Sequence, residues 1–160
     1  MNRFLITCAA ATLLGTAAFA QDNNEMTMPT GDIAAGEAAF GQCATCHVVQ
    51  NEAGETLAGR NAKTGPNLYA IAGRQAGTVE DFRYSPSMVE AGEKEMIWNE
   101  VHFVAYVQDP TGYLREYLDD KRARGKMAFK VRAEEDALNL YAYLYSLAPP
   151  AEGEAAPATN

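Results

Sequence analysis

Residues 43–47 read Cys-Ala-Thr-Cys-His. Two cysteines separated by two residues and followed at once by a histidine are typical of covalent c-type haem attachment. The two thiols form thioethers with the haem vinyl groups, and the adjacent imidazole reaches the iron from one face. The motif therefore predicts one haem c per chain, bound through Cys43 and Cys46, with His47 as a metal ligand.

The first 20 residues have the pattern of a secretory signal peptide. Arg3 supplies a positive start, an almost wholly apolar stretch follows, and Ala18-Phe19-Ala20 matches the small-x-small pattern of a cleavage site. The apolar stretch is shorter than the roughly 20 residues that a membrane span needs. Cleavage after Ala20 is therefore favoured over an uncleaved membrane anchor. We expect the mature chain in the periplasm, without a stable membrane anchor.

Three other interpretations fit the motif less well. A redox pair of the thioredoxin type is expected within a β-α-β pattern, whereas this motif follows a predicted helix in a helical sequence. A zinc site needs four ligands, and His102 is the only further Cys or His of the mature chain. A chance match is a poor explanation in an exported chain that has no other cysteine.

The charge balance excludes one broad class of function. The chain has 160 residues, with 13 Lys and Arg against 21 Asp and Glu, a net charge of −8 that becomes −9 when Arg3 is removed with the signal peptide. A nucleic-acid-binding domain needs a basic footprint, so nucleic acid is excluded as a partner. Hydrophobic residues make up 48% of the chain, which is compatible with one packed domain.

The mature chain divides into one folded region between two polar ends. Residues 21–31 are polar and predict a frayed lead-in, while residues 149–160 are rich in Pro, Ala and Glu and predict a disordered tail. Residues 32–148 are expected to form the folded domain, in which there is no internal repeat.

Three helices can be placed in this domain. Asp32 is a good N-cap and predicts a helix over 33–42, Asn99 predicts a second helix that ends at Pro110, and a third is expected over 133–147. The apolar stripe of the second helix is expected to consist of Val101, Val104 and Val107, with Phe103 alongside. No segment shows sustained strand alternation. The predicted fold class is therefore all-α, with long loops that need something to pack on.

The second face of the haem iron needs a separate ligand or stays open. The candidates are Met26, Met28, Met88, Met96, Met127 and His102. The first two methionines lie in the predicted lead-in, and the next two are interpreted as partly buried packing residues. His102 is interpreted as a helix-surface or hydrogen-bonded histidine. Met127 stands apart, because it lies in a short segment before the last helix, where a loop could cross the open haem face.

The chain resembles the class I c-type cytochromes, and within them the cytochrome c2 group of alphaproteobacteria. The resemblance covers nearly all of residues 31–147, and several motifs occur in the same order. These are Gly36 and Phe40, the motif at 43–47, KTGPNL at 63–68, Gly73-Arg74, Tyr84, Trp98, Tyr106, Asp109-Pro110, KMAF at 126–129 and LYAYL at 140–144. The resemblance implies the cytochrome c fold, in which the N- and C-terminal helices cross and long loops wrap around one covalently bound haem.

The resemblance also implies roles for side chains around the haem. It implies Met127 as the second metal ligand, a Pro66 carbonyl that orients the His47 ring, and a Tyr106 hydroxyl that approaches the methionine sulfur. The residues implied to bind the haem propionates are Arg74, Tyr84 and Trp98. An anionic propionate that is buried without such partners would be costly.

The function that the resemblance implies is electron transfer. Ligation by histidine and methionine leaves no open position on the iron and raises the reduction potential. The implied protein is a monomeric one-electron carrier and not an enzyme. Its donor would be the cytochrome bc complex, and its acceptor a photosynthetic reaction centre, a terminal oxidase or both. The alternative is a small haem enzyme of the peroxidase or reductase type with a displaceable sixth ligand.

Basic residues cluster around Met127. From Arg115 to Arg132 the chain has seven basic and three acidic residues, a net charge of +4, whereas the rest of the mature chain carries −13. Such a dipole would orient the haem edge toward an acidic partner and speed their encounter. The predicted docking residues are Lys121, Arg122, Arg124, Lys126, Lys130 and Arg132. The alternative interpretation is an ordinary solvated loop.

Overall fold

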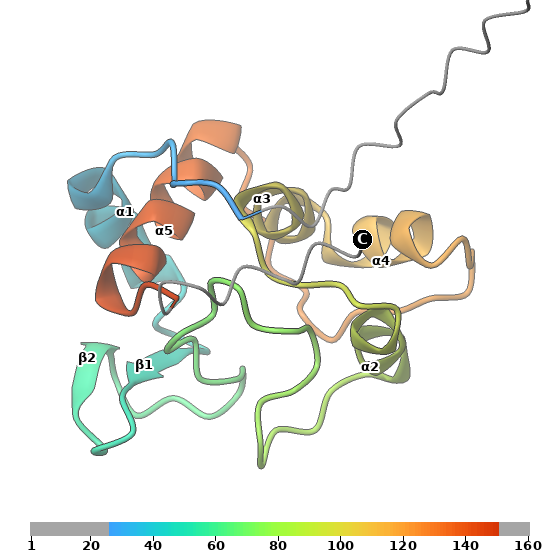
Figure 1. Ribbon diagram of the computed structural model, residues 1–160, viewed down its shortest axis with the longest axis horizontal. Coiled ribbons are helices and arrows are strands. Elements are labelled where there is room, and N and C mark those ends of the chain that lie inside the picture. Colours follow the sequence, from blue (N-terminus) through green and yellow to red (C-terminus); the bar gives the residue numbers. More distant parts are fainter. Residues whose placement is uncertain (1–25, 151–160) are drawn as a thin grey trace, which may run out of the picture.

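The computed structural model describes residues 26–150, which form helices beside a small β-hairpin (Figure 1). In chain order the elements are α1 (Ile33–Ala39), the 3-10 turn η1 (Phe40–Gln42), β1 (Val48–Gln50), β2 (Thr56–Gly59), α2 (Pro86–Glu93), α3 (Glu100–Gln108), α4 (Pro110–Tyr117) and α5 (Glu134–Leu147). The predicted signal peptide with its cleavage after Ala20, the start of the predicted lead-in and the tail from residue 151 lie outside the described residues. Within residues 26–150, no helix is long and apolar enough to cross a membrane.

α1 and α5 cross at a point where only glycine fits. A Cβ atom at Gly36 would lie 1.9 Å from the carbonyl oxygen of Asn139 and 2.8 Å from the Cβ of Tyr143. Beside this contact, the rings of Phe40 and Tyr143 pack with their centroids 5.7 Å apart. Figure 1 shows the two helices packed together at one end of the molecule. The predicted crossing of the N- and C-terminal helices is confirmed.

The ends of these two helices follow local capping rules. The Asp32 carboxylate accepts a hydrogen bond from the Ala35 amide at 2.7 Å, as expected of an N-cap. The helix predicted over 33–42 is α1 followed by the tighter turn η1. α5 begins at Glu134, one residue later than predicted, and its first turn holds three acidic residues that suit the helix dipole.

The segment before α1 is held in place at its end, contrary to the prediction of a frayed lead-in up to residue 31. The Thr30 amide donates to the buried carboxylate of Glu100 at 2.8 Å, and the Thr30 hydroxyl donates to the same carboxylate at 3.1 Å. Gly31 lies so close to α5 that a Cβ there would be 2.3 Å from the Leu138 carbonyl oxygen. The prediction was wrong here because a polar sequence can also be fixed by hydrogen bonds to a buried acceptor.

The predicted apolar stripe of α3 is confirmed at Val104 and Val107, with Phe103 alongside, and is wrong only at Val101. Val101 is 62% exposed, whereas Phe103, Val104 and Val107 are buried. The buried face begins at Glu100, because positions 100, 103, 104 and 107 follow helical spacing. Glu100 belongs to this buried face although it is charged, because its carboxylate accepts hydrogen bonds from Thr30. A pattern of apolar residues alone could not show this.

The charged stretch before Trp98 forms α2, which was not predicted. Ser85 caps it by accepting from the Met88 amide at 3.2 Å, and Pro86 occupies its first turn. Met88 and Met96 are 4% and 0% exposed. They are therefore core residues, rather than the partly buried packing residues that were expected. A Cβ at Gly92 would lie 2.0 Å from the Ala76 carbonyl oxygen, so α2 packs against the backbone of the preceding loop.

Two further short elements were not predicted. Pro110 follows the end of α3 and also starts α4, whose N-cap Asp109 accepts from the Gly112 amide at 3.2 Å. β1 and β2 form an antiparallel hairpin with Val48 opposite Gly59 and an irregularity after Val49. Strands of three and four residues are too short to show an alternating pattern. The hairpin begins directly after His47.

Candidate haem-binding site

The Cys-x-x-Cys-His segment is wound into a tight turn at the end of η1. The Cys43 amide donates to the Phe40 carbonyl at 2.9 Å, and the His47 amide donates to the Cys43 carbonyl at 2.9 Å. Both cysteines are half-buried and have free thiols. This turn brings the two thiols and the imidazole into one short stretch of backbone, as covalent haem attachment requires.

The alternative roles of the two thiols find no support in the site. Burial, with a smaller contribution from Cys46, raises the pKa of the Cys43 thiol to about 11. A reactive cysteine of the thioredoxin type has a lowered pKa, because the thiolate is the reactive form. No cluster of three or more His, Cys, Asp or Glu in residues 26–150 could hold a metal ion.

The His47 ring is oriented by a backbone carbonyl. Its Nδ1 donates to the carbonyl oxygen of Pro66 at 2.9 Å. Because a carbonyl can only accept, Nδ1 carries the proton and Nε2 keeps the lone pair that a metal needs. Burial lowers the pKa of His47 against the opposing effect of the Pro66 hydrogen bond, which favours the neutral imidazole.

Gly65 covers the face of this ring, a role that could not be predicted from the sequence. A Cβ at Gly65 would lie 2.4 Å from Cε1, 2.6 Å from Nδ1 and 2.8 Å from Nε2 of His47. The Gly65 amide also donates to the Cys46 carbonyl at 2.7 Å. The loop over residues 65–66 therefore clamps the attachment segment by its backbone alone.

Four more predicted haem contacts come together in the structure. The Trp98 amide donates to the Arg74 carbonyl at 2.9 Å, and the ring centroids of Trp98 and Tyr106 are 5.1 Å apart. Tyr84 lies close enough to Arg74 for their charges to affect each other's pKa. Burial and the proximity of Tyr84 raise the pKa of Tyr106 to about 12. All four therefore belong to one part of the molecule, although they come from separate loops and a helix.

Arg74 is a half-buried cation that has no acidic partner among residues 26–150. Its guanidinium donates to the carbonyl oxygens of Tyr69 at 2.7 Å and Asn67 at 3.2 Å. Burial lowers its pKa, and no carboxylate in residues 26–150 forms an ion pair with it. Such a cation suits an anionic group that the protein itself does not supply.

The segment around Met127 is fixed to three neighbouring elements. The Gly125 amide donates to the Thr111 hydroxyl at 3.2 Å, and the Val131 amide donates to the Val107 carbonyl at 2.9 Å. The Lys126 ammonium donates to the Arg83 carbonyl. Between these anchors Met127 is half-buried against the core.

The side chains of the other candidate ligands are buried in the core, exposed to solvent or in contact with other residues. Met88 and Met96 are buried in the core, and Met28 is 74% exposed with its sulfur 3.6 Å from the Tyr145 hydroxyl. Met26 packs beside Gly73. His102 is buried and hydrogen-bonded to Tyr113, so it is not on the helix surface.

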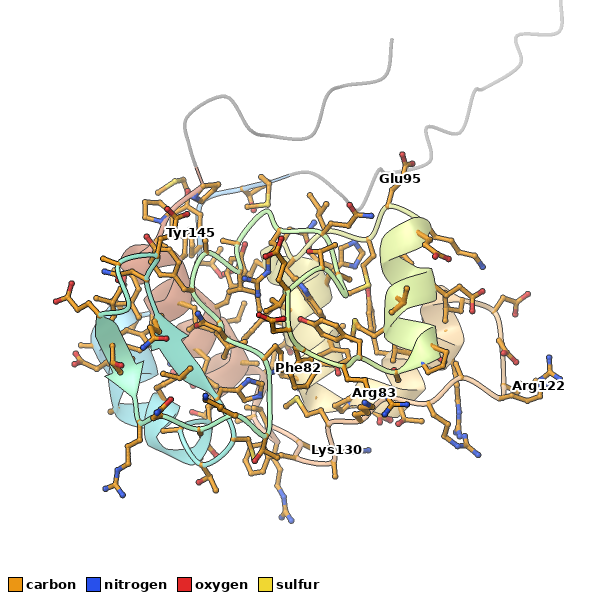
Figure 2. All side chains as sticks on the ribbon, turned by 90° about the horizontal axis from the view of Figure 1, so that it is seen from below. Phe82, Arg83, Glu95, Arg122, Lys130 and Tyr145 are labelled. Atoms are coloured by element: carbon orange, nitrogen blue, oxygen red, sulfur yellow. The ribbon has the colours of Figure 1, made fainter. Side chains whose placement is uncertain are left out.

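The predicted docking residues are all exposed, but they differ in their partners. Lys130 pairs with Asp109 at 2.8 Å, and Arg122 pairs with Asp120 at 3.4 Å. Figure 2 shows Arg83, Arg122 and Lys130 on the lower side of the view, opposite Glu95. The remaining docking residues, none of which forms an ion pair with an acid of residues 26–150, are Lys121, Arg124, Lys126 and Arg132.

The residues present fit a covalently bound haem. The two free thiols could form thioethers with the vinyl groups, the imidazole of His47 has its Nε2 available to iron, and Arg74 offers a half-buried positive charge to a propionate. The donor set is one neutral nitrogen and two thiols adjacent in sequence, which is the chemistry of c-type attachment.

Comparison with known proteins gives close relatives along most of the chain. The chain is 64% identical over 118 residues to cytochrome c2 of Rhodovulum adriaticum, which covers 74% of this chain and 94% of that protein. It is 57% identical over 119 residues to cytochrome c2 of Cereibacter sphaeroides, covering 74% and 96%. No family model matches the chain.

Solved structures agree with this result. The crystal structure of cytochrome c2 from Rhodobacter sphaeroides superposes with a TM-score of 0.73 at 57% identity, covering 74% of this chain and 97% of that one. The fold of that protein is therefore shared by most of this chain.

Proposed function

Because the chain belongs to the cytochrome c2 group of the class I c-type cytochromes, which carry electrons with one covalently bound haem c, we propose that it shuttles single electrons in the periplasm with His47 and Met127 as axial ligands. The observation that carries the proposal is the attachment turn, in which the Pro66 carbonyl holds the His47 ring with Nε2 available to iron. The haem would supply the one-electron redox chemistry. The protein would supply attachment, orientation and burial.

The choice of Met127 rests on its surroundings. The other four methionines of residues 26–150 are either in the core, strongly exposed or packed at the N-terminal segment, and the nitrogen Nδ1 of His102 is bonded to Tyr113. Met127 is half-buried in a segment anchored at both ends. A thioether there would complete the iron coordination and raise the reduction potential.

Closed coordination favours electron transfer over catalysis. With His47 and Met127 both bound to the iron, oxygen or peroxide would have no open site there. The alternative of a small haem enzyme also loses its basis, because the relatives are electron carriers.

A spectrum of the oxidised holoprotein tests the ligation. Iron bound by methionine gives a weak near-infrared charge-transfer band. We expect this band in the unmodified protein and in Met28→Ala, whose side chain is 74% exposed. Met127→Ala should abolish it. A band that survives in Met127→Ala would show that another side chain is the ligand.

The proposed donor is a membrane cytochrome bc complex, and the proposed acceptor is a photosynthetic reaction centre, a terminal oxidase or both. The basic residues that bracket Met127 support docking onto acidic surfaces of these partners. Turnover with an isolated reaction centre and an isolated oxidase, each offered as the acceptor, distinguishes the two. Saturable oxidation by neither would contradict the assignment of acceptors.

A further inference from the structure

His102, which is buried, and Tyr113, which is half-buried, form a polar pair that the proposed function does not use. His102 lies in α3 with only 6% of its surface exposed, and its Nδ1 is hydrogen-bonded to the hydroxyl of Tyr113 in α4. Burial lowers the pKa of His102 and raises the pKa of Tyr113, so both groups are neutral at pH 7. A phenol is a better donor than a neutral imidazole, so Tyr113 donates and Nδ1 accepts.

The pair reaches the haem-binding site through contacts between rings. Tyr106 follows His102 by four residues in α3, so their side chains share one face of the helix. The Tyr113 ring packs against both, with centroids 6.0 Å from His102 and 6.2 Å from Tyr106. Tyr106 packs on Trp98 at 5.1 Å. The ring of Tyr106 therefore lies between Trp98 and a Tyr113 ring whose tip is tied to His102.

We propose that His102 and Tyr113 are positioning residues for the sixth-ligand side of the haem, because their hydrogen bond fixes the Tyr113 ring that holds Tyr106 in place. This inference rests on the proposed ligation by Met127 and on the Tyr106 hydroxyl lying beside that ligand. If the Tyr106 ring were free to shift, the surroundings of the iron would become more polar. Polar surroundings stabilise the ferric charge, so the reduction potential would fall.

Reduction potentials of the holoprotein at pH 7 test this role. Tyr113→Phe removes one oxygen and keeps the ring, while His102→Leu removes the acceptor. We expect both to lower the potential, and the double variant to match either single variant, because the two side chains act as a unit. His102→Gln offers an amide oxygen as a new acceptor and should restore much of the original potential.

Tyr117→Phe is the matched control. Tyr117 also packs against His102, with centroids 5.6 Å apart, but its hydroxyl donates to the Lys94 carbonyl at 3.1 Å. Removal of the Tyr117 hydroxyl should leave the reduction potential unchanged. If Tyr113→Phe shifts the potential no more than this control, or if the effects of the two single variants add, the inference is wrong. Should His102→Leu fail to fold, the comparison of Tyr113→Phe with Tyr117→Phe decides.

The near-infrared band separates this inference from the proposed function. A band that is absent from the unmodified protein contradicts ligation by Met127, and with it the basis of the inference. A band that is present in all variants, together with unshifted potentials, contradicts only the positioning role of His102 and Tyr113.

Discussion

Gly65 confines the His47 ring with its backbone, and this contact leaves no room for a side chain. A methyl group there would lie 2.4 Å from Cε1 of the ring. In Gly65→Ala, either the imidazole leaves the Pro66 carbonyl or the backbone moves away from Cys46. Overpacking of this kind costs about 1–3 kcal/mol. We expect the free energy of unfolding of the holoprotein to fall by that amount in denaturant titrations.

Gly41→Ala provides the comparison for this substitution. Gly41 lies in η1, two residues before Cys43, and no atom lies within 4 Å of a Cβ placed there. Its stability should stay close to that of the unmodified protein. Equal losses for the two variants would mean that the contact between Gly65 and the ring has no energetic weight.

Residues with distinctive chemistry could be predicted, and residues that act by their shape could not. Cys43, Cys46 and His47 follow from their spacing alone, and Pro66 followed only from the resemblance. Gly65 stands next to Pro66 in the same quoted motif, but nothing in a sequence says which glycine lies against a ring. The contact depends on how the loop folds back onto the attachment turn.

The crossing of α1 and α5 predicts that alanine at position 36 destabilises the protein, although helix propensity alone would predict that it stabilises it. Gly36→Ala adds a residue that favours a helix interior by about 1 kcal/mol. It also places a methyl group 1.9 Å from the Asn139 carbonyl oxygen. We expect a net loss of about 1–3 kcal/mol, because two backbones must separate. Thermal unfolding of the holoprotein followed by far-ultraviolet circular dichroism measures it.

Ala38→Gly makes the reverse change at an exposed position of the same helix. It should cost about 1 kcal/mol by propensity alone. If Gly36→Ala is as stable as the unmodified protein or more stable, the two helices do not approach each other as closely as described. The larger loss is expected for Gly36→Ala, although alanine is the better helix former.

Elements with a clear apolar period could be predicted, whereas short elements held by tertiary contacts could not. The apolar stripe of α5 predicted the bounds of that helix to within one residue. The exposed residues of α2 include both Val89 and Glu90, so its sequence shows no clear apolar stripe, and the residues that face inward are Met88, Ala91 and Gly92. Pro110 predicts the end of one helix, yet its fixed geometry equally suits the first turn of the next.

The distribution of charge over the whole molecule changes which basic residues are expected to guide docking. Counting along the chain gives +4 for residues 115–132. In space, Asp109 lies outside that segment but pairs with Lys130 at 2.8 Å. An exposed ion pair is a weak bond, yet it cancels charge that a distant partner would otherwise sense. Arg124 and Arg132 therefore contribute more to the docking field than Lys130 does.

Steering by this field predicts a rate that depends on salt. Electrostatic attraction raises association rates by about 10–10³-fold at low ionic strength. We expect the second-order rate of electron transfer to an acidic partner to fall at least about 10-fold as salt rises. Arg132→Gln should lower the low-salt rate and flatten this dependence. The measurement is stopped-flow or flash kinetics over a salt series.

Lys94→Gln removes the same positive charge from a residue outside the segment 115–132, a lysine that pairs with Glu90 at 3.5 Å. If only the net charge mattered, both variants would slow the reaction equally, since each makes the protein more acidic by one unit. If the local field around Met127 guides docking, Arg132→Gln slows it more. A rate that does not change with salt would contradict electrostatic docking altogether, because an acidic protein can approach an acidic partner quickly only with its basic face turned toward it.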